Sequence, residues 1–204
     1  MKMLAWGVVG FLLFAHSAAA GQKVAADSSS SAPSAASSAF AKSAAAGTPA
    51  DTMAAFRFFV GIWQPVKDPN AAPPKVSETY TFAPILDGAF LMSQELYKDA
   101  SGKIVYRDFA VFGVDPDTHK LFLHAYNTDG SIDRTHQIDS PPAQWVFLGT
   151  VYGSPRFRDY RYTLTKTDDT HMGVLIELLK DGKYEKLTET HYERKSTDAR
   201  PEVQ

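Results

Sequence analysis

About ten short segments of this chain alternate apolar and polar residues, and turn residues separate almost all of them. Alternation with a period of two is typical of a strand that buries one face. Asp129-Gly130 and Asp181-Gly182 are strong hairpin signals between such segments. The pattern predicts strands at 62–66, 76–86, 89–98, 104–114, 121–128, 131–139, 144–152, 157–167, 171–180 and 183–195.

Consecutive hairpins along a whole domain favour an up-and-down meander. Closing such a meander into a barrel removes its two exposed strand edges. We therefore expect an all-β fold, an antiparallel up-and-down barrel of about ten strands.

The stretch FRFFVGIWQPV, residues 56–66, crowds aromatic side chains around one glycine. Apolar residues at helical spacing predict a short helix over 52–59. Gly61 permits a sharp change from helix to strand, because it has no Cβ to clash. We expect this helix to cover one end of the barrel, with Phe56, Phe59 and Trp63 filling that end.

The N-terminus has the pattern of a secretory signal peptide over residues 1–20. Lys2 precedes an apolar run over 3–15, and Ala18 and Ala20 fit the small-x-small rule for cleavage. The alternative is a retained membrane anchor, but the run falls short of the roughly 20 residues that a spanning helix needs. This predicts a periplasmic or secreted protein with no integral membrane segment after cleavage.

Residues 21–50 are almost all Ala and Ser, which bury too little apolar area to offset chain entropy. They predict a disordered tether in front of a barrel domain over 51–196, with a disordered tail over 197–204. A tether of this kind can hold a domain near a partner and raise its effective concentration there. A structural or interaction module is therefore one hypothesis for the function.

The composition excludes several classes of site. The chain has no cysteine, so it has no disulfide, thiolate metal site or cysteine nucleophile. Its 21 Lys and Arg nearly balance 23 Asp and Glu, which argues against nucleic acid as the main partner. No histidine pair has zinc-motif spacing, and no nucleophile elbow, P-loop or dinucleotide fingerprint occurs. The sequence gives no support for an enzyme and sets no oligomeric state.

Segment 131–139 suggests a binding site. Its Asp133, Thr135 and Gln137 share a wholly polar face, which we expect to lie outside the barrel. Arg134 and His136 would then point inward, and a buried charge needs a partner or a wet cavity. One interpretation is a cavity that binds the anionic or polar group of a ligand. The alternative is an internal ion pair between Arg134 and a carboxylate such as Glu95.

Strand aromatics suit the wall of a cavity for a small, partly apolar ligand. We therefore expect a binding barrel for such a molecule, with no metal in the site. The predicted ligand-binding residues are Arg134, His136, His124, Tyr126, Trp145 and His191.

Four stretches together resemble one family: FRFFVGIWQPV, ILDGAFLMSQE, FGVDPDTHKL and the terminal HYERK. They look like the group known as domain of unknown function 1579, which is similar in shape to lipocalins and nitrobindins, so the resemblance implies a calycin/lipocalin-like barrel. The resemblance covers about residues 53–195 and implies a barrel, with no activity to inherit.

Nitrobindin-like barrels bind haem through a histidine on a late strand, which implies His191 as an iron ligand here. A haem-binding enzyme or sensor is thus a further alternative. The run Gly61-Ile62-Trp63-Gln64-Pro65 lacks the later glycines that those barrels usually carry, which weakens the haem hypothesis.

Overall fold

The computed structural model describes residues 49–67, 69–70, 72, 74–154 and 158–200. The predicted signal peptide, the predicted tether up to residue 48 and residues 201–204 of the predicted tail lie outside the described residues. Among the described helices, none has the length and apolar character needed to cross a bilayer.

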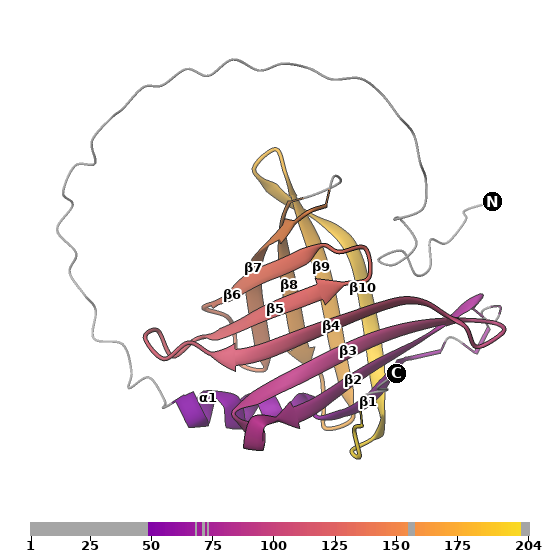
Figure 1. The fold of residues 1–204 in the computed structure, drawn as a ribbon, viewed down its shortest axis with the longest axis horizontal. Coiled ribbons are helices and arrows are strands. Elements are labelled where there is room, and N and C mark those ends of the chain that lie inside the picture. The colour runs from indigo at the N-terminus through magenta and orange to yellow at the C-terminus, as the bar shows by residue number, and fades with distance from the viewer. Residues whose placement is uncertain (1–48, 68, 71, 73, 155–157, 201–204) are drawn as a thin grey trace.

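The helices are short and the strands dominate (Figure 1). The helical elements are α1 (Pro49–Phe56), η2 (Arg57–Phe59) and η3 (Leu86–Gly88). The strands are β1 (Gly61–Pro65), β2 (Val76–Ile85), β3 (Phe90–Asp99), β4 (Ile104–Val114), β5 (Leu121–Asn127), β6 (Ile132–Ile138), β7 (Gln144–Tyr152), β8 (Asp159–Lys166), β9 (His171–Lys180) and β10 (Lys183–Ser196).

The ten strands form one closed antiparallel barrel in the order β1-β10-β9-β8-β7-β6-β5-β4-β3-β2. Each strand pairs with its neighbour in the sequence, and β1 closes the barrel by pairing with both β2 and β10. In Figure 1, strands β2 to β6 cross in front of the steeper strands β8 to β10. The fold class, the number of strands and the meander topology are confirmed.

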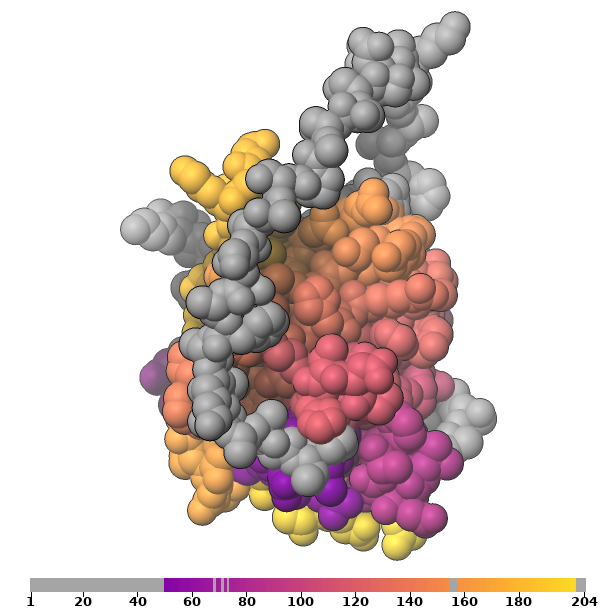
Figure 2. All heavy atoms as spheres, turned by 90° about the vertical axis from the view of Figure 1, so that its left-hand side faces the viewer, coloured from indigo at the N-terminus to yellow at the C-terminus, as the bar shows by residue number. Residues whose placement is uncertain are grey.

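The α1 end of the barrel is filled by aromatic side chains, as the sequence predicts. Phe56, Phe59 and Trp63 are fully buried. The ring of Phe56 lies 4.9 Å from that of Phe112 on β4 and 5.7 Å from that of Trp145 on β7. Figure 2 shows α1, in indigo, at the lower end of the molecule. The helix begins at Pro49, earlier than predicted, and its last turn is the 3-10 segment η2.

Gly61 is required where the helical segment gives way to β1. Its φ of +142° lies outside the range that side chains tolerate, and a Cβ there would lie 2.5 Å from the Ser196 carbonyl oxygen. The next buried residue, Trp63, donates its indole N–H to the Phe59 carbonyl at 2.7 Å. The Arg194 guanidinium covers the Trp63 ring, 4.5 Å from the ring. This corner therefore joins the first and last strands.

The predicted inside and outside faces of β6 are wrong. Thr135 is buried and pairs with the buried Leu123 of β5, while Arg134 and His136 are exposed. The polar face of β6 can point inward because Thr135 and Gln137 accept hydrogen bonds from backbone N–H groups of β5. The expectation that a wholly polar face must lie outside therefore fails for this strand.

Candidate functional site

Three carboxyl groups face the barrel interior side by side on β2, β3 and β4. Strand register creates this arrangement: Glu95 of β3 pairs with Asp108 of β4 on one side and with Tyr80 of β2 on the other. Glu78 lies two residues before Tyr80, so it shares the same inner face. The backbone N–H of Glu95 donates to Asp108 Oδ1 at 3.0 Å. Antiparallel pairing thus brings three acids from separate strands into one cluster.

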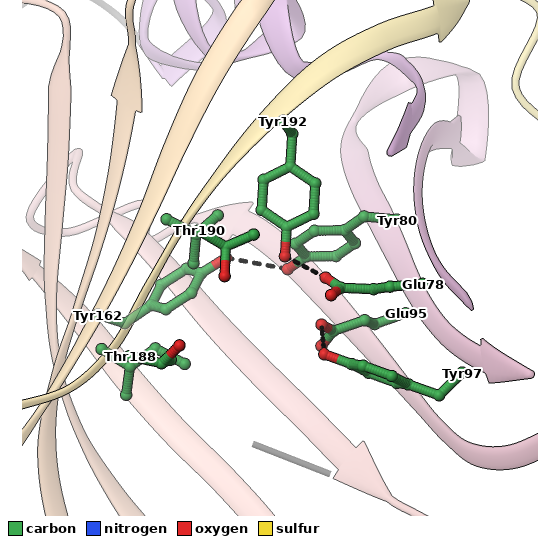
Figure 3. A pocket seen from close by; sticks show the side chains of 10 residues that line it. Glu78, Tyr80, Glu95, Tyr97, Tyr162, Thr188, Thr190 and Tyr192 are labelled. Atoms are coloured by element: carbon green, nitrogen blue, oxygen red, sulfur yellow. Dashed lines mark hydrogen bonds between the residues drawn. The ribbon is translucent and has the colours of Figure 1, made fainter. Parts of the chain in front are cut away.

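Tyrosine hydroxyls donate to these acids from neighbouring positions (Figure 3). Tyr97 donates to Glu95 Oε1 at 2.7 Å, and Tyr192 of β10 donates to Glu78 Oε1. Tyr80 and Tyr162 of β8 join hydroxyl to hydroxyl at 2.9 Å across the barrel. These bonds hold the rings in fixed positions around the carboxyl groups.

A small cavity of about 40 Å³ opens between these groups. Figure 3 shows Glu78, Glu95 and Tyr97 on one side, with Tyr162, Thr188 and Thr190 opposite. A water molecule needs roughly 10–15 Å³ of such space, so the cavity has room for about three. The cavity is lined by Glu78, Tyr80, Glu95, Tyr97, Tyr162, Val174, Ile176, Thr188, Thr190 and Tyr192.

The cluster makes its carboxyl groups weak acids. Burial, followed by the charge of Glu95, raises the pKa of Glu78 to about 8. Burial, followed by the charge of Asp108, raises the pKa of Glu95 to about 8. Burial likewise raises the pKa of Asp108 to about 7. Near neutral pH the cluster therefore holds protons that ordinary carboxyl groups would have lost.

A fourth interior carboxyl group, Asp133 of β6, lies beyond Asp108. It accepts hydrogen bonds from Asn127 at 3.4 Å and from the Tyr160 hydroxyl at 3.3 Å. Gly149 makes room for the Tyr160 ring, because a Cβ there would lie 2.7 Å from it. Burial raises the pKa of Asp133 to about 6. The polar interior thus extends from β2 to β8.

Four of the six predicted ligand-binding residues lie together, but outside the barrel. His124 pairs with Arg134 across β5 and β6 on the outer face, and Tyr126 and His136 lie on that face too. Tyr126 is 50% exposed, and the Arg134 guanidinium lies over the Tyr152 ring at 5.5 Å. The predicted internal pair of Arg134 with Glu95 is therefore not formed, although Glu95 does point inward.

The other two predicted residues also lie away from the cavity. Trp145 points inward at the α1 end, where its ring lies 5.0 Å from that of Phe59, so it belongs to the core. His191 lies on the outer face of β10, and its side chain is 67% exposed. The inward positions of β10 that line the cavity are Thr188, Thr190 and Tyr192. This interior does not fit a haem, because β10 presents no histidine to it and the cavity is too small.

The alternation of inward and outward positions along a strand is a sequence signal that points to the interior acids. None of these acids was among the predicted ligand-binding residues. Glu78 has the same parity as Tyr80 and Phe82, and Glu95 has that of Tyr97. A carboxylate that shares a face with large aromatic residues is a candidate for the interior. Among the described residues, no group of three or more His, Cys, Asp and Glu side chains is arranged to hold a metal ion.

The comparison with solved structures finds the crystal structure of Rv2717c from M. tuberculosis, with a TM-score of 0.54. The two chains are 14% identical over 71% of this chain and 97% of that chain, so the likeness shows the fold alone. No protein-family model matches this sequence, and neither does any curated protein. The barrel is thus shared with a known structure, and the resemblance to domain of unknown function 1579 remains a prediction.

Proposed function

We propose that this barrel binds a small, partly apolar ligand in the tyrosine–carboxylate cavity between β2, β3, β8, β9 and β10. The observation that carries the proposal is a polar cavity inside a barrel whose α1 end is filled by aromatic side chains. Val174 and Ile176 supply apolar wall, while carboxyl and hydroxyl groups supply polar anchors. Apolar walls with a few fixed polar groups are typical of small-molecule sites.

The cavity wall carries polar groups with which a ligand can pair. They include the carboxyl groups of Glu78 and Glu95 and the hydroxyl groups of Thr188 and Thr190. A buried polar group without a partner costs free energy, so a ligand that pairs with such groups gains affinity. The ligand is small, because drug-sized molecules need about 300–1,000 Å³.

The first test uses the protein purified from its own host. Native mass spectrometry would detect a ligand that copurifies, and a thermal-shift screen of small polar compounds would detect one that does not. We expect Thr188→Leu to fill the cavity and abolish binding. Thr165→Leu is the matched control, because Thr165 lies on the outer face of β8. A folded wild-type protein without any bound or binding compound, or binding unchanged by Thr188→Leu, contradicts the proposal.

A further inference from the structure

The chemical class of the ligand follows from the charges inside the barrel. Four carboxyl groups face the interior, and no described Lys, Arg or His lines the cavity or pairs with them. Two cations on inward strand positions, Arg194 and Lys166, lie at the α1 end, where both cover the Phe58 ring. An anionic group, one of the two kinds that the sequence suggested, would find no cation to pair with and would repel each carboxyl group that ionises.

We propose that the cavity binds a small organic cation, a protonated amine whose ammonium group lies between Glu78 and Glu95. This inference rests on the proposed function and names its ligand class. An ammonium group has three N–H donors and no acceptor. The cavity offers the complement, because two carboxyl groups lie on one side and the hydroxyl oxygens of Thr188 and Thr190 lie opposite (Figure 3).

The surrounding rings favour the same class. Tyr80 and Tyr192 line the cavity with their ring centroids 6.0 Å apart, and Tyr97 and Tyr162 complete the wall. Their hydroxyl groups point toward the carboxyl groups and toward each other, so their oxygens add acceptors for the N–H groups of an ammonium. A short alkyl group on the nitrogen would contact Ile176. The cavity admits only a few non-hydrogen atoms, as in methylammonium or ethylammonium.

Binding of such a cation is coupled to protons. Glu78 and Glu95 face each other. Six other titratable groups face this pair: Tyr80 on β2, Tyr97 on β3, Tyr106 and Asp108 on β4, Tyr162 on β8 and Tyr192 on β10. None of these neighbours is a cation, so the pair holds protons until a cation replaces them. We expect binding to release protons near pH 7 and to tighten as the pH rises from about 6 to about 8.

The test compares three probes of similar size: ethylammonium, ethanol and acetate. Titrations followed by NMR should show ethylammonium binding about tenfold or more tightly than the other two, as expected for a desolvated charge-assisted contact.

Glu78→Gln and Glu95→Gln should each weaken the binding of ethylammonium by a similar factor. Glu189→Gln is the matched control, because Glu189 lies on the outer face of β10 and is exposed. Calorimetry in two buffers of different ionisation enthalpy should show proton release on binding.

The outcomes separate the two proposals. If ethanol or acetate binds in the cavity as tightly as ethylammonium, the ligand class is wrong and the binding function stands. If ethylammonium binds equally well to both glutamine variants, the assignment of its site is wrong. If none of the three probes binds and Thr188→Leu changes no ligand interaction of the native protein, both proposals fail.

Discussion

Arg134 contributes little to the fold, because its side chain is exposed and its one described contact is with the Tyr152 ring. An exposed cation–π contact stabilises by about 0.5–1 kcal/mol at most. We therefore expect Arg134→Met to change the free energy of unfolding by less than about 0.5 kcal/mol, since methionine keeps much of the ring contact. Urea denaturation measures this change. A loss of several kcal/mol would show that Arg134 has a buried partner.

Arg161 is the matched contrast on the same outer surface. It makes a bidentate pair with Glu177 at 2.6 and 2.7 Å, and it lies 4.4 Å from the Tyr184 ring. Glu177 is only 12% exposed while Arg161 covers it, so removing Arg161 takes away both the ion pair and that cover. We expect Arg161→Met to cost about 1 kcal/mol or more, clearly above Arg134→Met in the same urea experiment. Equal costs would contradict this ranking.

Helix α1 stabilises the barrel through one side chain above all. Phe56 is fully buried, and its ring contacts those of Phe59, Phe112 and Trp145. Phe56→Ala removes these contacts and leaves a cavity, which typically costs about 3–5 kcal/mol. We expect a loss of this size in the free energy of unfolding. Arg57→Ala, which changes the exposed next residue, should cost less than about 0.5 kcal/mol.

The turn into β1 depends on Gly61. Gly61→Ala combines a disfavoured φ with a backbone clash against Ser196, so we expect a loss of about 3 kcal/mol. Gly102 in the β3–β4 turn also has a positive φ, but a Cβ there meets nothing within 4 Å. Gly102→Ala should therefore cost only about 1 kcal/mol. Chemical denaturation of both variants tests whether the clash or the φ alone decides the cost.

The strands could be predicted from the sequence because alternation and turn residues can be recognised within a short stretch of chain. Alternation and turn residues place all ten strands to within about two residues at each end. Which face of a strand points into the barrel depends instead on residues elsewhere in the chain. On β6, pairing with β5 places Thr135 beside Leu123 and so turns Arg134 outward, and the composition of β6 alone suggested the opposite. A period of two defines two faces, and only the partner strands decide which one is inside.

The candidate site could not be predicted from the sequence for a related physical reason. Its members come from β2, β3, β8, β9 and β10, and their distances depend on barrel closure. From the sequence, Arg134 is the residue expected to carry charge inside the barrel, and Glu95 enters only as a partner for that arginine. Burial beside tyrosine hydroxyl donors is a second way to satisfy a carboxyl group, and it needs no arginine.

The interior acids make the stability of the whole molecule depend on pH. The pKa values of Glu78 and Glu95 rise from 4.5 to about 8 on folding, so between these limits the folded state binds more protons than the unfolded state. The free energy of unfolding must then fall as pH rises from about 5 to about 8. Each such group contributes a slope of up to about 1.4 kcal/mol per pH unit.

Urea denaturation at several pH values between about 5 and about 9 tests this dependence. A glutamine imitates a protonated glutamate, so the double variant Glu78→Gln, Glu95→Gln should show a flatter profile than the wild type. It should also be more stable than the wild type at the alkaline end. Profiles of equal slope for the two proteins would show that these carboxyl groups do not hold protons in the folded state.

The pairing of β1 with β10 also dictates the order of events during biosynthesis. The ribosome makes β1 first and β10 last, and only when residues 192–196 have emerged can they pair with residues 62–65. Until then β1 and the latest finished strand present two open edges, which are prone to pair with other chains. We therefore expect a nascent chain or a truncation product that ends before β10 to need chaperones. Closure of the barrel thus waits for its last strand.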